Sequence, residues 1–474
     1  MKLNKKYYII SVIAIIAAYF IFSVFTLSDA TRESVVYELI VCFGILILTV
    51  IQFIHNWYKL GSPTLLDWFR LTAFYSIIFD YLSLVNKFNG VIDWGYQGGV
   101  YLKPEFIIDT LFVVFIALIV LSITEKVIYV FRKRSIQETK YSLKSFNIFL
   151  FFSAAVYGLQ LYYLMSGKIG YGTGTEESTG DNSFVLQTVN NLSSVVLIVW
   201  GLFKYYYKTL KASQIKYYYL FLGTGMTIGI LSGMKESFIV PLVCFLIPFL
   251  KSGNQIPKKI MIIFGIFIMI LYPLNNNYRD ALNSKIGLTK SEAFLLALNK
   301  TYNTDVTHLF DSSSKSYSAR FSLYPYLQYS IEKEKEWDYY KNMNRYIYLP
   351  FSFIPRSLIP SKPISDTGAK LNKLIAGVEN NSQTATTFGW SYLEGGYIYV
   401  IISFFLLAFV VTYLGAVLFR GNLIHHVINA SLLITMLKTE SDVYFILAGI
   451  IQNFIITYGV LYIFTKRIRG SIVT

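Results

Sequence analysis

The sequence carries little charge and almost no cysteine. Charged residues make up 15% of its 474 residues, whereas soluble domains typically carry about 25%. The only cysteines, Cys42 and Cys244, both lie inside apolar runs, so neither a disulfide nor a zinc site is predicted. The low charge argues against a soluble globular enzyme, and the cysteine usage excludes a disulfide-stabilised secreted domain.

The motifs of soluble enzymes are also missing. The chain has no glycine-rich phosphate loop ending in Lys-Ser/Thr, no Gly-x-Ser-x-Gly elbow and no His-Glu-x-x-His sequence. His425 and His426 are neighbours on a predicted helix and cannot share one face, which favours packing roles. No acidic cluster has metal-binding spacing, so we predict neither a metal site nor a cofactor.

Long apolar runs are what the sequence does contain. A bilayer span needs about 20 residues, and helix is the default because lipid leaves backbone groups no other partner. We predict an all-α polytopic membrane protein with about twelve transmembrane helices. Ten lie near 7–28, 35–55, 64–85, 105–131, 146–166, 185–207, 216–234, 258–275, 390–419 and 442–465, and two shorter ones near 236–250 and 423–437. The first run exceeds a signal-peptide core, so we interpret it as an uncleaved helix.

The net charge of +15 is explained by orientation rather than by nucleic acid. Every loop that the count places inside is basic, as the positive-inside rule requires. These loops and their helix ends hold Lys2, Lys5, Lys6, Lys59, Arg132, Lys133, Arg134, Lys140, Lys144, Lys204, Lys208, Lys211, Lys216, Lys251, Lys258, Lys259, Arg420, Lys466, Arg467 and Arg469. Both termini are therefore expected in the cytoplasm. Residues 276–385 form a large extracytoplasmic loop between membrane domains 1–275 and 386–474.

The large loop holds the densest set of candidate residues. We expect 317–331 to lie flat at the interface as an amphipathic segment and 366–376 to be helical. Three prolines in Ile354-Pro-Arg-Ser-Leu-Ile-Pro-Ser-Lys-Pro363 rule out a regular helix there and leave Arg356 and Lys362 on a stiff turn. Such cations suit phosphate recognition, although contact with solvent or lipid headgroups is the alternative.

Charges at membrane depth are the other signal, because they are costly and tend to be functional. Glu394 precedes Gly395-Gly396 at a helix start and is a candidate to orient an arginine or accept a proton, unless it lies at the interface. Lys235 belongs to either a binding site or an ordinary hairpin turn. Asp67 and Arg70 are three residues apart and are expected to pair. The pattern assigns no role to Asp80 and Asp109.

These strings carry a resemblance to bacterial O-antigen polymerases of the Wzy type. Such proteins have about a dozen helices and a large periplasmic loop. The loop often ends in Pro-Arg…Pro-x-Lys-Pro, as at 355–363, before a glycine-bearing helix start, as at 392–397. A Ser-Gly-(Arg/Met)-(Arg/Lys) turn, as at 232–235, often precedes it. The chain departs from members with paired Arg-x15-Gly loops, since no arginine of 276–385 has a glycine sixteen positions later.

The resemblance implies a GT-C-like glycosyltransferase of the bacterial cytoplasmic (inner) membrane that polymerises undecaprenyl-pyrophosphate-linked repeat units into O-antigen, capsule or exopolysaccharide. Its partners would be these lipid-linked glycans, the bilayer and a chain-length regulator, with no nucleic acid. Cations would stabilise the leaving pyrophosphate, and a carboxylate or histidine would accept the acceptor's proton. The pyrophosphate candidates are Arg320, Arg356, Lys362, Arg279 and Lys235. The catalytic base candidates are Glu394, His308 and Asp311.

Three other functions remain open at this stage. An O-antigen ligase shares the architecture and the donor but transfers the glycan to a lipid core. A flippase or transporter of lipid-linked sugars would show similar halves, and none is evident. A non-catalytic assembly subunit would need none of the loop cations.

Overall fold

In the computed structural model, most of the described residues are helical. The described residues are 18, 20–27, 35–60, 63–87, 96–97, 100–131, 139–169, 181–254, 270–271, 273–282, 290–304, 322–337, 341–364, 367–377, 383–418, 423–437 and 439–472. Six helices among them are long and apolar enough to cross a membrane, spanning Val36–Tyr58, Pro104–Val130, Phe146–Met165, Val185–Tyr206, Gly396–Gly415 and Val443–Phe464. Two shorter apolar helices span Ser237–Lys251 and Leu423–Met436. The chain is therefore an all-α membrane protein in class.

The predicted apolar runs are largely helical where the structure describes them, but the run 390–419 is interrupted at Glu394 and Gly395, between Leu393 and Gly396. The runs 7–28 and 258–275 lie largely outside the described residues, and the count of twelve stays a prediction. The run 64–85 is helical but carries Asp67, Arg70 and Asp80, and it is not among the six apolar spans.

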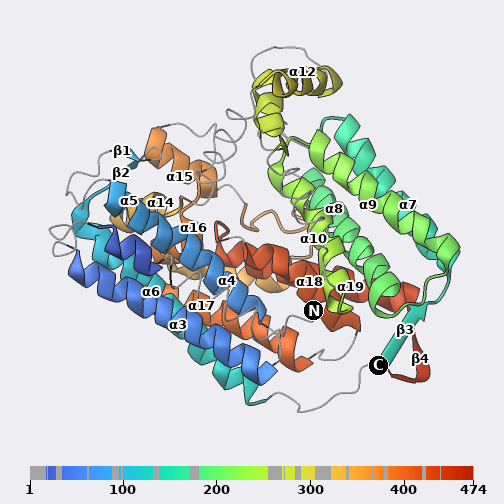
Figure 1. Cartoon of the computed structure of the whole chain (residues 1–474), viewed down its shortest axis with the longest axis horizontal. Helices are drawn as coiled ribbons and strands as arrows, with labels where there is room; N and C mark the ends of the chain where they lie inside the picture. The colour runs from blue at the N-terminus through green and yellow to red at the C-terminus, as the bar shows by residue number, and fades with distance from the viewer. Residues whose placement is uncertain are drawn as a thin grey trace.

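Most of the described helices pack around the two largest apolar cores (Figure 1). The first core joins α3 (Val36–Leu60), α4 (Leu65–Ala73), η1 (Phe74–Phe79), α5 (Asp80–Lys87), α6 (Ile107–Tyr129), α14 (Tyr324–Glu332), α16 (Thr386–Leu393) and α17 (Gly396–Thr412). The second joins α7 (Phe146–Met165), α8 (Asp181–Gly201), η3 (Leu202–Tyr206), α9 (Ala212–Leu231) and α10 (Lys235–Lys251). Both α18 (Leu423–Met436) and α19 (Val443–Phe464) contribute to each core, which ties the two groups together.

Two small sheets mark opposite ends of the helices (Figure 1). Strand β3 (Thr139–Leu143) follows α6, β4 (Thr465–Ile472) follows α19, and the two pair antiparallel. We call this the sheet end. Strands β1 (Tyr96–Gln97) and β2 (Val100–Tyr101), with α14 and α15 (Thr367–Ala376), lie at the other end, the loop end. Because β3 and β4 pair, the segments after α6 and α19 lie at the same end of the helices.

Several helix boundaries follow from short-range chemistry. Thr64 and Asp67 form a capping box at the start of α4, which satisfies two backbone N–H groups that the first turn leaves open. The side chain of Asp442 caps α19 by accepting from the Tyr444 N–H. Gly229 in α9 faces the backbone of Phe238 so closely that a Cβ would meet it at 2.6 Å. Only glycine permits that contact between α9 and α10.

The helix α14 differs from the expectation of a segment flat on the membrane surface. Its residues Tyr324, Leu327 and Ile331 are buried in the first core, and it packs against α16 and α6. Its polar side chains find internal partners: Gln328 donates to the Lys103 carbonyl, and Ser330 Oγ donates to Tyr326 O at 2.7 Å. In the sequence, Gln328 and Ser330 look like part of a solvent-facing side of the helix. In the structure both side chains form hydrogen bonds within the protein. Residues 317–321 lie outside the described residues.

Asp80, the first residue of α5, links α14 to the membrane helices through hydrogen bonds. Its Oδ2 accepts from Ser322 Oγ at 3.1 Å and from the Tyr324 N–H at 3.0 Å. We expect Asp80→Ala to lower the free energy of unfolding by about 1–3 kcal/mol, because a half-buried N–H and a hydroxyl lose their acceptor. Denaturant unfolding in detergent measures this change. Asp80→Asn keeps one side-chain oxygen and should cost less, so equal losses in the two variants would contradict this role.

Candidate functional site

A buried ion cluster joins the large loop to the membrane helices. Arg345 lies in η5 (Lys341–Phe351), a 3-10 helix of the large loop. Its guanidinium makes a bidentate pair with Asp442, at 2.5 Å from Nη1 to Oδ2 and 2.8 Å from Nη2 to Oδ1, and also contacts Glu394. All three residues are at most 4% exposed. These contacts hold η5 of the large loop against the starts of α17 and α19.

A break between α16 and α17 places Glu394 in this cluster. α16 ends at Leu393, and Gly395 and Gly396 take φ values of +151° and +70°, a backbone region that favours glycine. Glu394 therefore sits at the corner with α17 rather than within a continuous helix. On the opposite side, Asp442 serves both as the N-cap of α19 and as the partner of Arg345.

The charge balance of the cluster bears on the role of Glu394. One guanidinium faces two buried carboxylates. The sequence expectation that Glu394 orients an arginine fits this geometry, and the arginine is Arg345.

Arg356 and Lys362 lie together in the proline-rich turn, which is not a regular helix. Arg356 donates from Nε and Nη2 to the Lys362 carbonyl at 3.2 and 2.5 Å. Lys362 Nζ donates to the carbonyls of Ser352 and Ile354 at 3.0 and 2.6 Å. Across the described part of the chain, neither cation contacts a carboxylate. Two half-buried positive charges are thus fixed by neutral oxygens alone.

The other predicted site residues are distributed as follows. Arg279 lies in the helical residues 273–282, and its neighbour Tyr278 donates a hydrogen bond to Leu231 O at 3.0 Å. That carbonyl ends α9, just before the turn 232–234 that leads to Lys235, the first residue of α10, so the structure brings these two segments together. His308, Asp311 and Arg320 fall outside the described residues.

A second buried ion cluster lies towards the sheet end. Arg70 pairs with Asp67 at 2.9 Å, as expected from their spacing, and with Glu125 of α6 at 2.7 Å. Asn56 donates to both Asp67 oxygens at 3.0 Å, and Thr64 donates to Glu125 at 2.8 Å. Each charged group of this cluster has an oppositely charged partner, although Arg70 Nε has no hydrogen-bond acceptor among the described residues. The cluster is best explained as a structural link between α3, α4 and α6.

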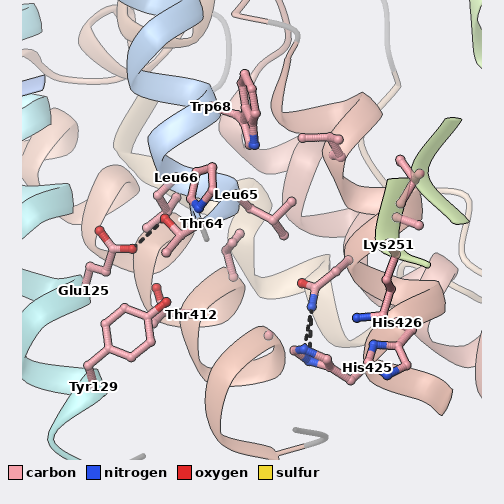
Figure 2. Close-up of a pocket in the computed structure, with 17 residues that line it drawn as sticks. Thr64, Leu65, Leu66, Trp68, Glu125, Tyr129, Lys251, Thr412, His425 and His426 are labelled. Carbon is pink, nitrogen blue, oxygen red and sulfur yellow. Dashed lines mark hydrogen bonds between the residues drawn. The ribbon is translucent and has the colours of Figure 1, made fainter. Parts of the chain in front are cut away.

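A cavity of about 320 Å³ borders this second cluster (Figure 2). Thr64, Glu125, Tyr129 and Thr412 line one side, and Lys251, His425 and His426 line the other. These residues come from the start of α4, the ends of α6, α10 and α17, and the start of α18. The cavity is therefore at the opposite end of the helices from Arg345, and none of the predicted site residues lines it.

The sequence predicts Glu394, Arg356 and Lys362 as site residues, but it singles out neither Arg345 nor Asp442, which form the ion cluster with Glu394. Arg345 was one of several loop cations with nothing in its neighbourhood to distinguish it. Asp442 directly precedes a long apolar run, which is an N-cap signal, but its second role requires a partner 97 residues away. Pairing across such a separation cannot be derived from local spacing.

The chain was compared with protein-family models, curated proteins and solved structures. None of them matches it.

Proposed function

We propose that this protein is a glycosyltransferase that polymerises lipid-pyrophosphate-linked oligosaccharide repeat units at the outer face of the bacterial cytoplasmic membrane. The observation that carries the proposal is the pair of fixed cations, Arg356 and Lys362, on a stiff turn beside membrane helices. They have no carboxylate partner in the described part of the chain, and charges placed like this are typically functional.

The chemistry matches what two such cations supply. The acceptor hydroxyl forms a bond to the anomeric carbon of the donor glycan, and the bond from that carbon to the pyrophosphate oxygen breaks. The electron pair leaves with the lipid pyrophosphate, and the hydroxyl proton passes to a base. Negative charge grows on the departing diphosphate, so preorganised cations lower the barrier. Arg356 offers a planar fork for two phosphate oxygens and Lys362 a point charge.

The ion cluster at Arg345 supports the same reaction indirectly. Because it fixes η5 to α17 and α19, it holds the following turn, with its two cations, in one place. Placement within a fraction of an ångström is what electrostatic stabilisation of a leaving group requires. Glu394 and Asp442 are therefore positioning residues in this proposal.

The deciding experiment is a deletion strain analysed for the length of its surface glycan. We expect long chains to collapse to a single repeat unit, and the intact gene supplied in trans to restore them. Normal chain lengths would refute the proposal. Accumulation of full-length lipid-linked polymer would instead identify a ligase, and loss of extracytoplasmic repeat units would identify a flippase.

A further inference from the structure

The depth of the proline-rich turn can be measured along α19. Asp442 caps the first turn of this helix, and Gln452 Nε2 donates to Ser352 O at 2.7 Å. At 1.5 Å per residue, ten residues place Gln452 about 15 Å below Asp442. The helix of 22 residues is about 33 Å long, close to the hydrocarbon thickness of about 30 Å. Ser352 is therefore held near the middle of a membrane-spanning helix.

The length of the 3-10 helix η5 agrees with this depth. Arg345 contacts Asp442 at the top of α19, and Ser352 follows seven residues later. At about 2.0 Å per residue, η5 descends about 14 Å over that length. On its other side, Tyr346 hydroxyl contacts Ser403 Oγ of α17 at 3.2 Å. The segment thus runs down between two transmembrane helices.

Most of the side chains that this segment exposes are apolar, and its exposed polar residues are Ser357 and Ser361. Ile347 is 71% and Leu358 73% exposed, and Phe351 and Phe353 are each more than 40% exposed. In water this surface would cost about 25 cal/mol per Å², and apolar patches of this kind mark contact with a membrane or a partner. At mid-membrane depth, contact with acyl chains removes the cost.

The hydrogen bonds of the turn fit the same surroundings. Irregular backbone at membrane depth must have its carbonyls satisfied by protein or by a water-filled cavity. Arg356, Lys362 and Gln452 together donate to the carbonyls of Ser352, Ile354 and Lys362. The two cations thus support the backbone that carries them.

We propose that residues 345–364 form a re-entrant membrane segment, and that the phosphate group of a lipid reaches Arg356 and Lys362 from within the bilayer while its hydrocarbon chain contacts Phe351, Phe353 and Leu358. The second half of this inference rests on the proposed function, and the first half does not. The segment is then part of the membrane domain, although its sequence position assigns it to the extracytoplasmic loop.

Spin labelling of the full-length protein in lipid vesicles tests the re-entrant position. A nitroxide on Leu358→Cys should collide readily with oxygen, which concentrates in lipid, and poorly with a water-soluble nickel chelate. Ile455→Cys on α19 provides the lipid-facing control, and Lys335→Cys, an exposed loop residue, provides the aqueous control. Both native cysteines are buried, so the unsubstituted chain gives the labelling background. Nickel accessibility equal to that of Lys335→Cys would overturn the re-entrant segment and leave the polymerase proposal intact.

Ligand addition to the same labelled protein tests the route. Farnesyl diphosphate in the vesicles should reduce label mobility at position 358, and Arg356→Gln should abolish that response. Inorganic pyrophosphate supplied in the buffer should have no effect. An equal response to inorganic pyrophosphate would show entry from water and refute the lipid route. No response to either ligand would refute phosphate binding at these cations, even if the label proves lipid-exposed.

Discussion

Replacing Arg345 with leucine is expected to lower the free energy of unfolding by about 3–5 kcal/mol, because two buried carboxylates, Glu394 and Asp442, lose their only guanidinium partner in the cluster. An uncompensated buried charge costs far more than the pair contributes when intact. The measurement is unfolding in detergent, together with the amount of protein recovered in membranes. We expect both to fall, because this cluster is the junction of η5, α16, α17 and α19.

The control for this substitution lies in the same segment. Arg356→Leu removes an arginine that bonds only to a backbone carbonyl among the described residues, so it should cost about 1 kcal/mol. Neutralising the partners in the triple variant R345L/E394Q/D442N should recover most of the lost stability, since no buried charge is then left alone. If the triple variant is no more stable than Arg345→Leu alone, the cluster is not held by charge pairing.

Features that depend on nearby residues could be predicted from the sequence, whereas contacts between distant residues could not. Apolar length predicted the described helices of the membrane domains, because in lipid the backbone has no alternative to intrahelical bonding. The spacing of Asp67 and Arg70 predicted their pair, because three residues place two side chains on one helix face. The third partner, Glu125, comes from α6, and nothing in the spacing of charges indicates that helix.

The same limit applies to the candidate site. Prolines alone indicated that Arg356 and Lys362 lie on a shaped turn, since proline removes donors and fixes φ. The depth of that turn depends on Gln452, which is 100 residues from Ser352. The sequence of the loop is polar enough to predict an extracytoplasmic position, whereas most of the exposed side chains around the turn are apolar, and Arg356 and Lys362 donate to backbone carbonyls of the turn itself. A sequence pattern shows which residues are polar, but it does not show which group each of them contacts in the folded protein.

Arg356→Gln and Lys362→Gln should each reduce glycan chain extension by about 10²- to 10³-fold, the loss typical when one preorganised stabiliser of developing negative charge is removed. The readout is extension of a lipid-linked acceptor by purified protein in vesicles, with the amount of membrane protein measured alongside. Arg356→Lys keeps the charge but not the two-pronged geometry, so it should recover only part of the activity.

Lys335→Gln gives the matched control for these variants. It removes the same unit of charge from an exposed position of the large loop, and extension should stay at the level of the unsubstituted protein. An equal loss in Lys335→Gln would mean that the overall charge of the loop, rather than two fixed cations, drives the reaction. Full activity in both Arg356→Gln and Lys362→Gln would remove the pyrophosphate role. The re-entrant position of the turn would still stand, because the contacts of Ser352, Gln452 and Arg345 do not depend on catalysis.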